Sequence, residues 1–161
     1  MGKKMIFSMV ISLTAIMVLL LAGCTLGDEK NLTALPSLTG TWTINSGGTF
    51  SQGSTNGTFG RDFIITVKQE NTTLQGMGKD VSRGRPADIP GGEVVLNGEV
   101  KDGSKVTFTV HEDFPVPGGK GDLVHEFSGT VLKGTISGTF QGGFDAEPKY
   151  RINGTFVVSV D

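Results

Sequence analysis

The sequence predicts an all-β domain whose strands close into an eight-stranded antiparallel up-and-down barrel. Between Leu38 and Asp161, apolar and polar residues alternate in eight segments, which is the pattern of half-buried strands. Turn-forming residues separate several of these segments, as in sequential hairpins, and no segment beyond residue 23 has a helical period. A β-sandwich is the alternative interpretation.

Glycine placement favours the barrel over the sandwich. Five glycines fall by alternation on the inward face in mid-strand: Gly76, Gly98, Gly129, Gly138 and Gly154. A glycine loses packing there, so it is useful only where a strand bends sharply or another backbone comes close. In up-and-down order the last strand can also pair with the first, which removes both sheet edges.

The N-terminal segment is typical of a secretory signal. Lys3 and Lys4 precede an apolar run at residues 5–21, which ends in Leu-Ala-Gly-Cys. This ending resembles a prokaryotic lipobox, and the resemblance implies cleavage before Cys24 and attachment of a lipid with palmitate-type acyl chains to its thiol. An uncleaved membrane helix is the alternative, although the run is short for a span. Cys24 is the only cysteine, so no disulfide competes for it.

These features divide the chain into a signal peptide (1–23), a lipidated polar tether (24–37) and a β-barrel domain (38–161). The part that follows the signal is long enough for one domain with a core and too short for two. We expect an exported lipoprotein, anchored to the cell membrane or outer membrane through Cys24, whose domain faces the periplasm or the exterior.

The first half of the domain contains four expected strands. Trp42 and Ile44 share one face of residues 40–44, and Phe63, Ile65 and Val67 share one face of residues 63–68. Residues 46–60, crowded with Gly, Ser, Thr and Asn, are expected to form a loop or a ragged hairpin. A turn at residues 70–72 leads to a strand at 73–78. The longest loop is expected at residues 79–92, before a strand at 94–101.

The second half contains the other four strands. Asp102-Gly103 turns the chain into residues 106–110, the clearest hairpin of the sequence. A second loop is expected at residues 112–121. A strand at 123–131 then turns at Lys133-Gly134 into residues 136–140. A third loop is expected at residues 141–149, before the last strand at 150–160.

The start of the domain resembles the calycins, the group of lipocalins, fatty-acid-binding proteins and avidins. Gly40-Thr41-Trp42 is similar to their Gly-x-Trp signature, and residues 38–42 are similar to the opening of avidin-like chains. The resemblance implies a barrel of the kind that often binds a small ligand. Two departures stand out. Arg151, the candidate for the arginine that packs over the tryptophan in lipocalins, points outward by alternation, and biotin sites use several tryptophans where this chain has only Trp42.

Few residues point to catalysis or metal binding. No nucleophile elbow, phosphate loop, zinc-protease helix or paired-cysteine motif is present, so we expect neither an enzyme nor a cofactor. A metal site shared by His111 and His125 is disfavoured, because alternation puts His111 on the outer face and His125 on the inner one. Acidic residues outnumber basic ones, 16 to 14, and no basic patch appears, which disfavours nucleic acid as a partner.

Two hypotheses for function remain. In the first, the barrel holds a small apolar or amphipathic ligand. Arg83 and Arg85 are candidate contacts at its mouth, against a simple solvated loop, and the candidate lining residues are Trp42, Phe63, Phe108, His125, Phe127, Phe140 and Phe156. In the second, these side chains fill the barrel, and the loops at 79–92, 112–121 and 141–149 bind an envelope protein, for instance as an inhibitor.

Glycosylation is an open question at Asn31, Asn56, Asn71 and Asn153, each of which begins an Asn-x-Thr triplet.

Overall fold

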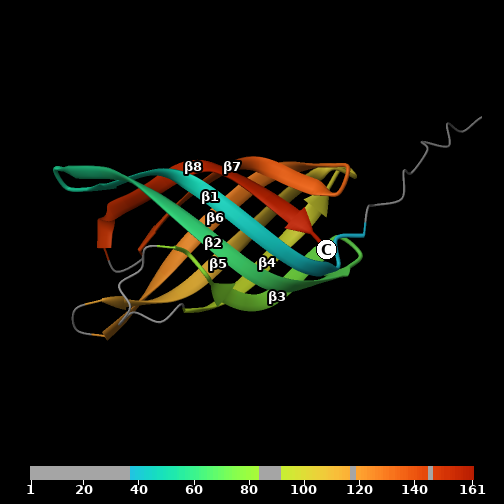
Figure 1. Cartoon of the computed structure of the whole chain (residues 1–161), viewed down its shortest axis with the longest axis horizontal. Coiled ribbons are helices and arrows are strands. Elements are labelled where there is room, and N and C mark those ends of the chain that lie inside the picture. Colours follow the sequence, from blue (N-terminus) through green and yellow to red (C-terminus); the bar gives the residue numbers. More distant parts are fainter. Residues whose placement is uncertain (1–36, 84–91, 117–118, 145–146) are drawn as a thin grey trace, which may run out of the picture. The chain divides into compact units, whose positions relative to one another are not determined.

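Eight antiparallel strands form a closed barrel in the computed structural model, which describes residues 37–83, 92–116, 119–144 and 147–161 (Figure 1). The strands are β1 (Gly40–Gln52), β2 (Thr55–Glu70), β3 (Thr73–Asp80), β4 (Glu93–Lys101), β5 (Lys105–Val116), β6 (Gly119–Leu132), β7 (Thr135–Phe144) and β8 (Glu147–Val160). Each strand pairs with the next, and β8 pairs with β1. The prediction of an up-and-down barrel is therefore confirmed, and the sandwich alternative is wrong.

Several strands are longer than the sequence predicted. Residues 46–52 belong to β1 and pair on one side with β2 and on the other with β8, so residues 46–60, expected to form a loop or a ragged hairpin, are a hairpin that turns at residues 53–54. The loops expected at 112–121 and 141–149 are likewise mostly strand, because β5 pairs with β6 from Glu112 to Val116 and β7 continues to Phe144. In each case hydrogen bonding to neighbouring strands outweighs the low strand propensity of Gly, Asn and Pro.

The two ends of the barrel differ. At one end, which we call the turn end, the chain reverses at residues 71–72, 102–104 and 133–134, with left-handed backbone at Asn71 (φ 55°), Asp102 (φ 50°) and Lys133 (φ 51°). The barrel also begins and finishes there, since Thr41 and Asp161 exchange two backbone hydrogen bonds of 3.0 Å. At the opposite end, the loop end, the connections lie at residues 53–54, 81–92, 117–118 and 145–146.

Trp42 anchors the core near the turn end. Its side chain is fully buried, and its Nε1 donates a 2.8 Å hydrogen bond to the carbonyl oxygen of Leu38, itself 1% exposed. The backbone nitrogen of Leu38 in turn donates to Oε1 of Gln69 on β2. These contacts fix the chain at the point where it enters the barrel.

Glycines and phenylalanines share adjacent rows across the inner face. One row crosses from β4 through β8 to β1 and consists of Gly98, Phe108, Phe127, Phe140, Gly154 and Gly48. The row beside it places Gly129 and Gly138 next to Phe156. A Cβ at Gly129 would lie 2.8 Å from Cζ of Phe156, so this phenylalanine occupies space that the glycine leaves free. The expectation that an inward glycine permits another backbone to come near is confirmed at Gly138, where a Cβ would lie 2.6 Å from Cα of Gly129.

Candidate functional site

The residues expected to line a ligand cavity are all buried, and their rings contact one another. Phe108 stacks on Phe127 with centroids 4.6 Å apart and meets Trp42 edge-on at 5.4 Å. Phe127 lies 5.4 Å from Phe140 and 5.0 Å from Phe156. These contacts bring the aromatic candidates together in one cluster, which continues through His125 to Phe63 at 5.4 Å.

His125 lies inside the barrel and His111 outside, as alternation predicts. The side chain of His125 is fully buried, and neither of its ring nitrogens has a hydrogen-bond partner among the described residues. His111 is 42% exposed and makes a 2.9 Å contact through Nδ1 to Oδ2 of Asp122 on β6. The described part of the chain contains no group of three His, Cys, Asp or Glu side chains suited to a metal ion.

A cluster of ionisable side chains lies between the aromatic rings and the loop end, with Arg61 partly buried and Asp80 and Glu112 buried; we call it the interior polar cluster. Arg61 on β2 makes a 2.8 Å ion pair with Asp80 at the end of β3, whose side chain is fully buried. Ser82 donates from its backbone nitrogen, at 2.7 Å, and from its hydroxyl to the other carboxylate oxygen of Asp80. Glu112 on β5, also fully buried, lies with its Oε2 3.9 Å from Nε2 of His125.

The environment of this cluster shifts two pKa values. Burial alone acts to raise the pKa of Asp80, but hydrogen bonds from Ser82 and Glu112 and the charge of Arg61 outweigh it, so the pKa lies below its usual value of 3.8. Burial lowers the pKa of His125 below its usual value of 6.5, and the opposing influence of Glu112 does not reverse the shift. The cluster therefore favours an ionised Asp80 and a neutral His125.

The sequence analysis missed Arg61, Asp80 and Glu112. Arg61 has the same parity as Phe63, and Glu112 has the same parity as Val110, so strand alternation would have placed both inside. Because residues 79–92 and 112–121 were expected to be loops, alternation was not extended to Asp80 and Glu112. The longer strands bury these two residues, and Arg61, which lies between the expected segments 46–60 and 63–68, is partly buried.

Other candidate residues lie elsewhere. Arg83 is exposed beyond β3, whereas Arg85 falls outside the described residues, as do Cys24, the signal segment and Asn31. Arg151 is exposed on β8 and donates to the carbonyl oxygen of Tyr150, so it does not pack over Trp42. Asn56, Asn71 and Asn153 lie in described segments, and all three are exposed. No helix in the described ranges has the length and apolar character needed to traverse a bilayer.

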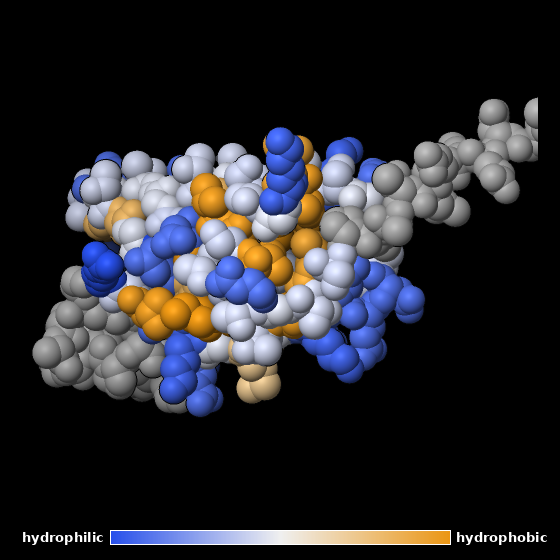
Figure 2. All heavy atoms as spheres, turned by 45° about the vertical axis from the view of Figure 1, so that its right-hand side comes forward, coloured by the Kyte–Doolittle hydropathy of each residue, from blue (hydrophilic) through white to orange (hydrophobic). Residues whose placement is uncertain are grey.

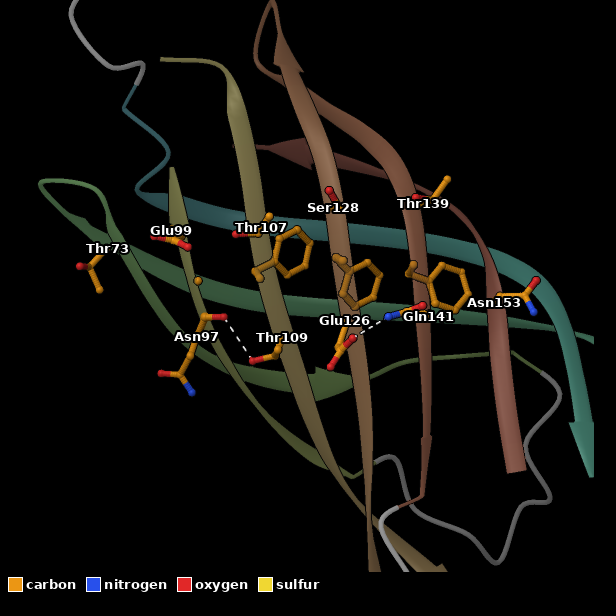
Figure 3. A pocket seen from close by; sticks show the side chains of 14 residues that line it. Thr73, Asn97, Glu99, Thr107, Thr109, Glu126, Ser128, Thr139, Gln141 and Asn153 are labelled. Carbon is orange, nitrogen blue, oxygen red and sulfur yellow. Dashed lines mark hydrogen bonds between the residues drawn. The ribbon is translucent and has the colours of Figure 1, made fainter. Parts of the chain in front are cut away.

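The described surface is hollowed on the outer side of β4 to β8. A depression of about 850 Å³ is lined mainly by outward polar side chains, among them Asn97, Thr109, Glu126 and Gln141 (Figure 3). A second depression of about 510 Å³ shares Glu126, Gln141 and Asn153 with it and reaches Arg151. Three of the residues expected to line a cavity, Phe108, Phe127 and Phe140, are also among the residues that line the larger depression.

Apolar side chains also reach the surface. Figure 2 shows apolar residues between polar ones on one face of the molecule. Among the exposed ones, Met77 on β3 (68% exposed) and Val95 on β4 (42%) are paired directly across the strands. No family model, curated protein or solved structure matches this chain.

Proposed function

We propose that this chain is a lipid-anchored envelope protein whose barrel is a packed scaffold and which binds a partner protein at its loop end. The lipid anchor rests on the sequence at residues 3–24, where a signal-like segment ends in Leu-Ala-Gly-Cys. Two or more acyl chains on Cys24 would give stable attachment to the membrane.

The observation that carries the scaffold proposal is the packing of the interior. Trp42, Phe108, Phe127, Phe140 and Phe156 contact one another through ring faces and edges, with centroids 4.6 to 5.6 Å apart. An eight-stranded barrel is just wide enough either to be filled by its own side chains or to hold one small ligand. Aromatic contacts of this density favour the filled barrel, since an interior ligand would have to displace the rings.

Aromatic residues near the loop end support a partner site there. Phe50 on β1 and Phe144 on β7 are partly buried, and both contact the ring of Tyr150 on β8, with centroids 6.1 and 5.0 Å away. Aromatic side chains are enriched in protein interfaces, and loops on a rigid scaffold commonly carry binding.

Site-specific photo-crosslinking in intact cells tests this proposal. A photoreactive residue at Thr55, exposed at the loop end, should give a discrete protein adduct. The matched position is Ser137, exposed on β7 near the turn end, and it should give none. Equal adducts from both positions, or none from Thr55, would contradict the assignment of the loop end.

Native mass spectrometry of the full chain, extracted in mild detergent, tests the filled interior and the anchor together. We expect the mass of a diacylated chain that begins at Cys24, with no further small molecule bound. A copurified molecule that leaves on denaturation would overturn the filled barrel and support the interior-ligand hypothesis. A Cys24→Ser variant should lose the lipid mass and remain uncleaved.

A further inference from the structure

β2 extends past its ladder with β3. The first residue of β2 in that ladder is Phe63, whereas β2 itself begins at Thr55. Residues 55–60 pair with β1 on one side, and on the other side no described strand pairs with them. Figure 1 shows this part of β2 in the hairpin at the upper left. We call residues 55–60 the β2 edge, because one side of this segment has no neighbouring strand in the described part of the chain.

The direction of the backbone groups along the β2 edge follows from the neighbouring residue, Asp62. The backbone nitrogen of Asp62 donates to Oγ of Ser82 at 2.9 Å, and its carbonyl oxygen accepts from the backbone nitrogen of Val81 at 2.7 Å. Both groups of Asp62 therefore point away from β1. Because successive residues of a strand point their backbone groups to opposite sides, every second residue of the β2 edge does the same. These residues are Asn56, Thr58 and Gly60.

The outward backbone groups of the β2 edge are open to solvent. Asn56, Thr58 and Gly60 are all exposed, and Gly60 has no side chain, so its exposed surface is backbone. Soluble proteins normally protect a strand edge with lysine, proline or a bulge. The β2 edge reads Thr-Asn-Gly-Thr-Phe-Gly, with no charged residue and no proline, and its register with β1 is regular. An additional strand could therefore pair with it unhindered.

The inward side of the β2 edge is apolar. Phe59 is partly buried and meets Phe140 edge-on, with ring centroids 5.9 Å apart. Gly57, the next inward residue, lies against the ring of Phe50, since a Cβ there would be 2.5 Å from Cε1 of this ring. An added strand would place every second side chain beside Phe59 and the others in solvent. The edge therefore favours a segment in which apolar and polar residues alternate.

We propose that the loop-end partner binds by adding an extended strand with alternating apolar and polar side chains to the β2 edge. This inference rests on the proposed function and specifies how the partner is recognised. Asn56, Thr58 and Gly60 each offer one backbone donor and one backbone acceptor to the added strand. In strand addition, backbone hydrogen bonds supply affinity and the alternate side chains supply specificity. Here the apolar side chains of the partner pack beside Phe59.

Amide hydrogen exchange of the full chain in detergent micelles, followed by NMR, tests whether the edge is open. After correction for intrinsic rates, we expect the amide protons of Thr58 and Gly60 to exchange at least tenfold faster than that of Phe59, which points toward β1. Similar protection of all three amide protons would mean that the edge is already covered. That result overturns strand addition and leaves the loop-end partner unaffected.

Photo-crosslinking from Thr55 in intact cells tests the mode of binding. Thr58→Pro and Gly60→Pro each remove an outward N–H, which proline can replace in a strand whose N–H faces solvent. We expect each change to lower the yield of the adduct tenfold or more. Thr58→Ala is the matched control, because it removes the side chain and keeps the N–H, and it should leave the yield unchanged. Circular dichroism melts establish which variants retain the barrel.

The outcomes separate this proposal from the proposed function. An adduct that persists in a folded proline variant overturns strand addition and leaves the loop-end partner in place. An adduct that is lost equally in Thr58→Ala also overturns it, because recognition would then depend on the side chain. An adduct with a second copy of this chain means that the edge pairs copies and overturns the assignment to a partner. Absence of any adduct from Thr55 contradicts the proposed function, and strand addition by that partner fails with it.

Discussion

Phe108 and Phe127 lie face to face on neighbouring strands inside the barrel, with ring centroids 4.6 Å apart and ring planes inclined by only 7°. The two residues are paired in the register of β5 and β6, and Phe127 also contacts Phe140 and Phe156. Phe127 is therefore the central member of the aromatic interior, and the stability lost when its ring is removed indicates how completely the barrel is filled.

Truncation of the Phe127 ring should strongly reduce the stability of the barrel. We expect Phe127→Ala to lower the free energy of unfolding by about 3–5 kcal/mol, since it removes buried contacts and leaves a cavity. Phe127→Leu should cost clearly less because it retains more volume. Urea denaturation measures both. A loss below about 1 kcal/mol for the alanine variant would mean that the interior has spare room, contrary to the filled barrel.

Gly138 should not accept a side chain. A Cβ there would lie 2.0 Å from the carbonyl oxygen of Ser128 and 2.6 Å from Cα of Gly129 on β6. Gly138→Ala should therefore destabilise the barrel by about 1–3 kcal/mol or more through overpacking. Gly60 is the matched control, because its added Cβ would lie 3.6 Å from the nearest atom, the carbonyl oxygen of Ser46. Gly60→Ala should be neutral or slightly stabilising in thermal melts; equal losses in both variants would contradict this explanation.

Stability should fall as the pH drops below about 6.5 because His125 is buried with a lowered pKa. The unfolded chain binds a proton near the usual histidine pKa, whereas the folded chain resists protonation until a lower pH. The contribution of His125 is thus fully present above pH 6.5 and is lost as the pH falls toward the folded-state pKa. Melting temperatures measured between pH 7.5 and 5 should show the decline.

Two histidine variants separate this effect from general acid sensitivity. His125→Phe keeps a ring among Phe63, Phe127 and Phe140 but cannot titrate, so its melting temperature should depend less on pH across this interval. His111→Gln removes the half-exposed histidine and should retain the pH dependence of the unaltered protein. If the His125→Phe profile runs parallel to the original, His125 is not the responsible group.

The ion pair between Arg61 and Asp80 should behave as a buried pair. Asp80→Ala leaves the guanidinium of Arg61 and two donors of Ser82 without this carboxylate, and we expect a loss of about 3–5 kcal/mol. The double variant Asp80→Ala with Arg61→Met should lose much less stability than the sum of the losses in the two single variants. A double-mutant cycle in urea measures this difference. The exposed pair Lys68–Glu70 is the control, and breaking it should have no measurable effect. Strict additivity at Arg61 and Asp80 would contradict direct coupling.

Alternation along single strands sufficed to predict the eight strands and the opposite orientations of His111 and His125. It did not reveal where strands end, because residues such as Gly47, Asn56 and Gly57 have poor strand propensity and are held by partners distant in sequence. For the same reason, alternation did not predict that Asp80 and Glu112 lie inside the barrel. The inner row of Phe108, Phe127 and Phe140 depends on cross-strand register, which turn lengths and packing determine together and which composition does not encode.

Closure of the sheet matters for the membrane attachment that we propose for this chain. Attachment to a membrane confines copies to a thin layer, where collisions between neighbours are far more frequent than in dilute solution. An open sheet would there expose a row of backbone donors and acceptors to the next copy. Because β1 pairs with β8 along Trp42 to Gln52, the wall of the barrel has no such edge, and crowded copies can lie wall to wall without merging their sheets.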